Sequence, residues 1–140
     1  MIFSRFLTLL WGVSVFAAWL TFAPEEACAQ DRLSVREVQL GVELERGEVV
    51  DPTLRFSQGA GRMYAVVYVD NPSRAAARIR VSFEREESSP RPGVALEMPA
   101  RPRYRTVART GLRRAPGRYV CVVRTEDGRE LARVPYEIVP

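Results

Sequence analysis

Apolar and polar residues alternate along most of the chain after residue 30, with the two-residue period of half-buried β-strands. The first such strand covers residues 38–44, where four apolar side chains alternate with polar residues or glycine. The clearest alternation covers residues 77–84 and predicts one face in the core and one in solvent. No stretch of this part keeps a helical period, so we predict an all-β fold.

A continuous apolar run at residues 63–69 is typical of a strand that is covered on both faces. Turn sequences separate the runs at residues 47–52, 58–61, 70–73 and 114–117. The last two strands are predicted to form a hairpin around Asp127-Gly128. Pro135 indicates that the final strand lies at an edge or is bulged. Together these signals predict an antiparallel β-sandwich of seven to eight strands.

The first 29 residues have the pattern of an export signal. Arg5 is followed by an uncharged, mostly apolar run at residues 6–23 and then by Ala27-Cys28-Ala29, a small-residue cleavage pattern. We expect a hydrophobic leader helix, cleaved before Gln30, and one β-sandwich domain at residues 30–140. The alternative is an uncleaved anchor at residues 6–23 that holds the domain at the inner membrane. With cleavage, the protein would be periplasmic or secreted.

Charge and cysteine content limit the chemistry that the domain can carry. The 140 residues have a net charge of +4, contain no histidine, and use arginine for every basic position. Removing the leader takes away Arg5, Glu25 and Glu26, so the net charge would rise by one to +5. Cys28 would also leave, and Cys121 would then have no partner for an internal disulfide. The lack of histidine excludes a histidine-based triad or a histidine-ligated zinc site.

One motif resembles a known fold family. Residues 115–121, Ala-Pro-Gly-Arg-Tyr-Val-Cys, are similar to the entry of strand F in immunoglobulin-like domains, where a tyrosine two residues before a cysteine bonds back across the corner. This resemblance, to bacterial immunoglobulin-like domains, implies an immunoglobulin-like sandwich. The domain lacks two hallmarks, a second cysteine and a core tryptophan, because Trp11 and Trp19 both lie in the leader.

A second resemblance covers most of residues 30–140. The short motifs at residues 56–64, 103–106 and 116–139 follow one another in an order that resembles an uncharacterised bacterial domain family of secreted or membrane-attached proteins. The usual tryptophans and the mid-domain histidine of that family are absent here. The resemblance implies an envelope location and no particular activity.

Four groups of residues contain side chains or spacings that are used in catalytic or binding sites. Cys121 lies mid-strand and is expected to be buried and inert, and the cluster Glu84, Glu86 and Glu87 is expected to be solvated loop charge. The Gly59-Ala60-Gly61 segment is interpreted as a turn and not as a phosphate loop, and Asp70-Asn71 as a turn and not as a calcium site. We therefore predict no catalytic residue, no cofactor, no metal, and no enzymatic activity.

The remaining signal is a concentration of arginine near residues 101–118. Arg103, Arg105 and Arg109 would share one face of a strand and form a positive stripe. The stripe has two interpretations, an anion- or partner-binding surface and a solubilising face that protects a sheet edge. Nucleic acid is not expected as a partner, because only Tyr104 adds an aromatic ring within the stripe. The candidate binding residues are Arg101, Arg103, Arg105, Arg109, Arg113 and Arg114.

The sequence therefore favours an exported, non-enzymatic binding or structural module of the bacterial cell envelope. Its expected contact is a sheet face or an edge strand against an envelope protein or an anionic glycan. The alternative is an anion-binding module that uses the arginine stripe for lipopolysaccharide, an acidic glycan or an acidic protein. Membrane contact is expected only if the leader is retained, and the oligomeric state stays open.

Overall fold

The computed structural model describes residues 32–140, so the predicted leader helix and its cleavage site lie outside the described residues. Every regular element within residues 32–140 is a strand, which confirms the all-β class. Over the same residues, no helix is present that could cross a bilayer. The strands are β1 (Ser34–Gly41), β2 (Glu43–Glu45), β3 (Glu48–Val50), β4 (Arg55–Ser57), β5 (Arg62–Asp70), β6 (Ala77–Arg85), β7 (Val94–Met98), β8 (Arg103–Gly111), β9 (Gly117–Thr125) and β10 (Glu130–Val139).

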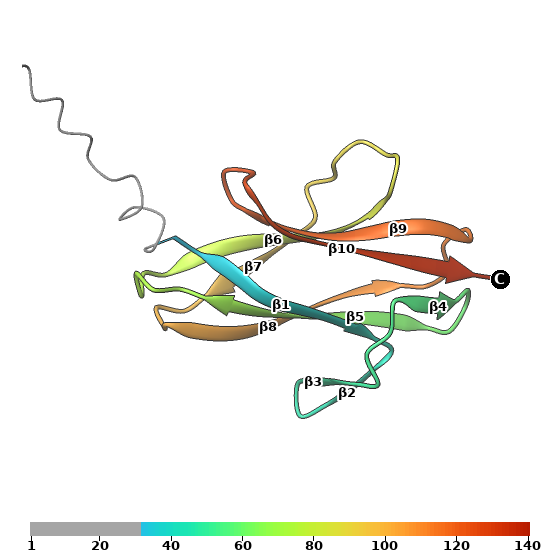
Figure 1. Cartoon of the computed structure of the whole chain (residues 1–140), viewed down its shortest axis with the longest axis horizontal. Coiled ribbons are helices and arrows are strands. Elements are labelled where there is room, and N and C mark those ends of the chain that lie inside the picture. Colours follow the sequence, from blue (N-terminus) through green and yellow to red (C-terminus); the bar gives the residue numbers. More distant parts are fainter. Residues whose placement is uncertain (1–31) are drawn as a thin grey trace, which may run out of the picture.

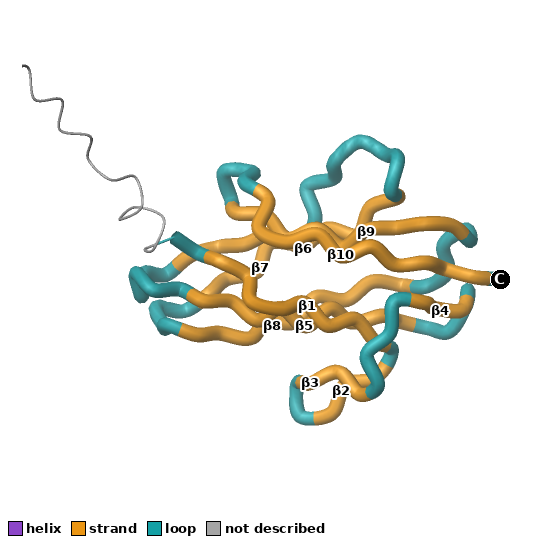
Figure 2. Tube along the Cα trace, viewed as in Figure 1, coloured by secondary structure: helices purple, strands orange, loops and turns teal. Residues whose placement is uncertain are grey.

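Two sheets lie face to face, and a small hairpin stands outside them (Figures 1 and 2). One sheet has three strands in the order β1-β5-β8, and the other has five in the order β4-β10-β9-β6-β7. The prediction of seven to eight strands was therefore too low. The prediction of purely antiparallel pairing was also wrong, because β4 runs parallel to β10 over three residues. The short β4 covers only the end of β10, so Pro135 lies on the part of the edge that β4 leaves open.

The small hairpin is β2–β3, which the sequence pattern did not predict. The expected strand at residues 38–44 breaks after Gly41, where the Val49 side chain packs so closely on the backbone that it occupies the place a Cβ atom would take. The expected turn at residues 47–52 contains β3 instead. The two-residue turn that joins β2 to β3 is Arg46-Gly47, with φ angles of 52° and 77°, the conformation that twisted hairpins prefer.

The core lies between the two sheets and is built from alternate residues of each strand. From β5 it takes Met63, Ala65, Val67 and Val69, all 0% exposed. The strands β6, β9 and β10 supply the opposite layer of the core: Ile79, Val81, Phe83, Tyr119, Cys121, Val123, Tyr136 and Ile138. Val66 is also 0% exposed although it lies outside this cluster, as expected for a strand covered on both faces. The segments β2 and β3 both approach β5, so they provide this second cover.

The outer face of β6 is partly buried, which contradicts the prediction that it meets solvent. Ser82 and Glu84 are each only 3% exposed. The loop between β6 and β7 rises over this face (Figure 1). Its Arg91 amide donates a hydrogen bond of 2.8 Å to Glu84 Oε1. A loop of this kind is invisible to a two-residue period, because the period reports only the side that faces the opposite sheet.

The corner before β9 and the final hairpin follow the expected local geometry. Tyr119 Oη donates a hydrogen bond of 2.6 Å to the Ala115 carbonyl, and its ring stacks on Tyr136 at a centroid distance of 5.7 Å. Asp127-Gly128 connects β9 to β10, with Gly128 at a φ of 92°, so the predicted hairpin is confirmed.

Candidate functional site

The outer face of the three-stranded sheet carries the predicted arginine stripe. Arg103, Arg105 and Arg109 alternate along β8 with residues that turn toward the core, among them the buried Ala108. The register between β5 and β8 places Arg105 opposite Tyr68 and Arg109 opposite Tyr64. Directly opposed residues of an antiparallel pair lie on the same face of the sheet. This surface therefore combines arginine with tyrosine, and we call Arg103, Arg105, Arg109, Tyr64 and Tyr68 the Arg–Tyr face.

Sequence reasoning missed both tyrosines of the Arg–Tyr face. They lie within the apolar run of β5, where the pattern suggested only burial, and both are half-buried. The aromatic residue that the sequence did associate with the stripe, Tyr104, packs against the core instead. A search for aromatic residues on the neighbouring strand would have found them, but only with the register known.

The other three predicted site residues do not join this face. Arg101 is exposed in the turn before β8, and Arg113 is exposed in the loop after it. Arg114 is half-buried and has a structural role, because its Nη1 donates to the Phe83 carbonyl at 2.8 Å and its Nη2 to Thr110 Oγ1 at 3.2 Å. The three arginines predicted to share a strand face therefore do so, whereas the other three candidate binding residues lie elsewhere.

One end of the Arg–Tyr face is extended by β1. The Arg36 guanidinium lies over the Tyr68 ring, 5.8 Å from its centroid. Asp70 Oδ1 lies 3.9 Å from Arg36 Nη1 and 3.8 Å from Arg103 Nε, and it accepts no hydrogen bond from any described side chain. One carboxylate therefore stands between two guanidinium groups, which leaves this end with an excess of positive charge.

The β2–β3 hairpin occupies the middle of the same face. Arg105 Nη1 lies 3.0 Å from Glu48 Oε1, and Arg105 Nη2 donates to the Arg46 carbonyl at 3.1 Å. Arg105 is therefore tied to the hairpin. By contrast, Arg109 and the neighbouring Arg62 take part in no ion pair within residues 32–140.

On the other sheet, the outer face holds a buried polar cluster. Glu84 Oε1 lies 2.9 Å from Arg124 Nη1, and it also accepts hydrogen bonds from Ser82 Oγ and the Arg91 amide. Burial by itself would raise the pKa of Glu84, but these three donors outweigh burial and hold the pKa below its ordinary value. The prediction that Glu84 is solvated was wrong, while Glu86 and Glu87 are exposed as expected. A carboxylate held in its ionised form is unsuited to donate protons near neutral pH.

Two further groups in the core are held in their neutral forms. Cys121 is 1% exposed, and burial raises the pKa of its thiol to about 12, which agrees with the inert cysteine that the sequence predicted. Burial likewise raises the pKa of Tyr136, whose hydroxyl has no hydrogen-bond partner among residues 32–140. The Asn71 side chain holds the turn after β5 by donating to the Ala75 carbonyl, in agreement with the turn prediction.

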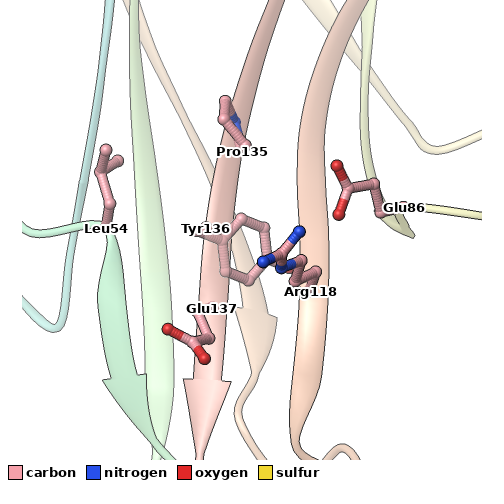
Figure 3. Close-up of a pocket in the computed structure, with 6 residues that line it drawn as sticks. All are labelled: Leu54, Glu86, Arg118, Pro135, Tyr136 and Glu137. Carbon is pink, nitrogen blue, oxygen red and sulfur yellow. The ribbon is translucent and has the colours of Figure 1, made fainter.

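A hollow of about 320 Å³ lies beside β10 and β9, at the end of the molecule that holds β4 (Figure 3). Leu54 and Pro135 supply apolar surface, and Arg118 lies between the side chains of Glu86 and Glu137 in this view (Figure 3). Two carboxylates with one guanidinium give the hollow mixed charge. Its charge alone therefore selects neither an anion nor a cation.

Comparison with known proteins gives a similarity of fold. No known protein family and no curated protein matches the sequence. Among solved structures, the alkylpurine DNA glycosylase AlkC of Pseudomonas fluorescens, bound to DNA containing an abasic site analog, is similar to this chain with a TM-score of 0.51 and 14% identity. The match covers 77% of this chain and 30% of the glycosylase chain. A likeness at this identity shows the fold alone.

These comparisons correct several sequence predictions. The resemblances to bacterial immunoglobulin-like domains and to the uncharacterised envelope family are not supported, since no family matches and the similar fold belongs to a DNA glycosylase. They had rested on short motifs such as the Tyr119 corner, which is held by a single local hydrogen bond. The similar structure, an enzyme bound to DNA, also points away from the envelope-module function, the lack of enzymatic activity and the exclusion of nucleic acid, so these three predictions are withdrawn. The exclusion had overlooked Tyr64 and Tyr68.

Proposed function

We propose that this domain binds single-stranded nucleic acid on the Arg–Tyr face of the β1-β5-β8 sheet. The observation that carries the proposal is the cross-strand register, which sets Tyr68 opposite Arg105 and Tyr64 opposite Arg109. Single-strand binding surfaces combine cationic side chains that follow the phosphates with aromatic rings on which bases stack. The face supplies both groups in adjacent rows on two strands.

The end of the face near Tyr68 is the better supported half. Here the Arg36 guanidinium lies on the Tyr68 ring, and a guanidinium plane is itself a surface on which bases stack. Arg103 stands beside it with a side chain that is 77% exposed. The opposite half carries Arg62 and Arg109, which make no ion pair within residues 32–140 and so can meet phosphates without first losing a partner.

Single strands are favoured over duplexes because the available contacts are rings on a sheet face. Reading a duplex generally requires a helix or a β-ribbon that enters a groove, whereas unpaired bases are free to lie on exposed rings. The DNA in the glycosylase structure supports nucleic acid as the class of partner, on fold similarity alone. If the leader directs export, as its sequence predicts, the nucleic acid would lie outside the cytoplasm.

Fluorescence anisotropy with a labelled oligothymidylate tests the proposal. The full chain should bind the single strand more tightly than a duplex of equal length, and binding should weaken as salt rises. Tyr68→Ala should weaken binding by roughly tenfold, the scale of one lost stacking contact. The control Arg55→Ser removes one exposed arginine from the other sheet and should leave binding unchanged. Equal affinity of wild type and Tyr68→Ala would overturn the proposal.

A further inference from the structure

A second hollow, of about 240 Å³, opens between the two sheets beside the start of β7. It exists because β7 pairs with β6 only over Ala77–Val81, so the later part of β6 has no neighbour on that side. Arg114 bridges this gap by bonding the Phe83 carbonyl on β6 and Thr110 on β8. The hollow is therefore a built feature of the fold, with a side chain fixed across one end.

Three arginines line this hollow, namely Arg91, Arg109 and Arg114. None of them takes part in an ion pair within residues 32–140, and no carboxylate lines the hollow in that part of the chain. Glu84 accepts the Arg91 backbone amide, but its charge is already matched by Arg124. The residues that line the hollow thus include three arginines and no carboxylate to match their charge.

The donors in the hollow suit a tetrahedral oxyanion. A guanidinium has five N–H groups, and Arg114 uses only two nitrogens for its structural bonds, so donors remain for a ligand. Arginine binds phosphate oxygens in paired, charge-assisted hydrogen bonds. The Thr110 hydroxyl also lines the hollow and adds a neutral polar group.

One wall of the hollow is apolar. Pro92 and the half-exposed Val94 lie along it, on either side of Gly93. A Cβ atom at position 93 would lie 2.5 Å from the Val81 carbonyl, and the residue has a φ of 68°, so only glycine lets this wall lie directly on β6. A ligand that combines an anionic group with a small organic part fits this arrangement better than a free inorganic ion.

We propose that this hollow binds the phosphate of a phosphomonoester, with the organic part of the ligand against Pro92 and Val94. The phosphomonoester can be a free mononucleotide or the 5′ end of a nucleic acid strand. Arg109 belongs both to this hollow and to the Arg–Tyr face, so a strand on that face could place its end here. This link rests on the proposed function, whereas phosphate binding in the hollow does not.

The test is calorimetric titration of the full chain with thymidine 5′-monophosphate, with thymidine and with inorganic phosphate. We expect the monophosphate to bind, thymidine not to bind, and inorganic phosphate to bind more weakly than the monophosphate. Arg91→Ser should weaken monophosphate binding by about tenfold, as expected for one lost charge-assisted contact. Arg55→Ser, a matched loss of one distant positive charge, should bind as wild type does. Equal binding of both thymidine compounds, or an unaffected Arg91→Ser variant, would overturn the proposal.

Oligothymidylates with and without a 5′-phosphate identify the source of the phosphate. Tighter binding of the phosphorylated strand, lost in Arg91→Ser, would assign the hollow to strand ends. Equal binding of both strands, together with intact monophosphate binding, would assign it to free mononucleotides. Tyr68→Ala separates the two proposals, because it should weaken strand binding and leave monophosphate binding unchanged.

Discussion

Glu84 and Arg124 form an ion pair of 2.9 Å beneath the β6–β7 loop, and the two side chains are only 4% and 16% exposed. The remaining hydrogen bonds of Glu84 come from Ser82 and from the Arg91 amide, which belongs to the loop. This one carboxylate therefore fixes the loop that forms a wall of the hollow lined by Arg91, Arg109 and Arg114. Removal of this carboxylate should lower both the free energy of unfolding and the affinity of the hollow for its ligand.

Glu84→Gln should lower the free energy of unfolding by about 3 kcal/mol, because it leaves the Arg124 charge buried without its partner. Urea denaturation of the full chain measures this change. The matched control is Glu130→Gln, which removes a half-exposed carboxylate from its pair with Arg133 and should cost less than about 1 kcal/mol. Equal losses of unfolding free energy in the two variants would show that the buried Glu84–Arg124 pair stabilises the fold no more than an exposed pair does.

The same carboxylate predicts how stability depends on pH. The folded pKa of Glu84 lies below its ordinary value of 4.5, so the folded state binds this proton more weakly than the unfolded state. The stabilisation is fully present above that ordinary value and is lost as pH falls through the lowered pKa. Urea midpoints measured from about pH 6 to about pH 3 should fall less steeply in Glu84→Gln than in wild type. Parallel profiles would contradict the prediction.

Cys121 should be unreactive until the protein unfolds. Burial raises the pKa of its thiol to about 12, so both access and thiolate content are low. In a chain with Cys28→Ser, a thiol reagent should modify Cys121 at least about a hundredfold more slowly in buffer than in denaturant. Rapid modification of the folded protein would show that β9 opens readily or is not buried.

Packing of the β2–β3 hairpin on the sheet can be tested at Gly41. A methyl group there would collide with the Val49 side chain, so Gly41→Ala should cost about 1–3 kcal/mol. In a Val49→Ala background the same change should cost clearly less, because the colliding atoms are gone. Additive losses in the double variant, measured by urea denaturation, would argue against this contact.

Part of this fold follows directly from the amino-acid pattern. The alternation at residues 77–84 and the run at residues 63–69 correspond to β6 and β5, and Asp127-Gly128 marks the last hairpin. These features depend on neighbours in sequence, which a local pattern reports well. The sequence also placed Arg103, Arg105 and Arg109 on one face, because alternation along a single strand is enough for that inference.

The features that depend on residues far apart in the sequence could not be predicted from the local pattern. Glu84 is in the polar phase of β6, and only the later loop buries it. Val42 is in phase with Leu40, yet it is 47% exposed because β1 ends at Gly41, where the distant Val49 packs on the backbone. Tyr68 joins Arg105 only through the register of β5 on β8, which no single-strand pattern specifies.

An amide NMR titration with an unlabelled oligothymidylate tests the central claim most directly. We predict that the resonances that shift will cluster on β5 and β8 around Tyr64, Tyr68 and Arg103, with few changes on β9 and β10. Tyr68→Ala should need about tenfold more oligothymidylate to reach the same shifts, while the spectrum of the free protein stays that of a folded domain. Shifts confined to the five-stranded sheet, or no saturable shifts at low salt, would contradict nucleic-acid binding on the Arg–Tyr face.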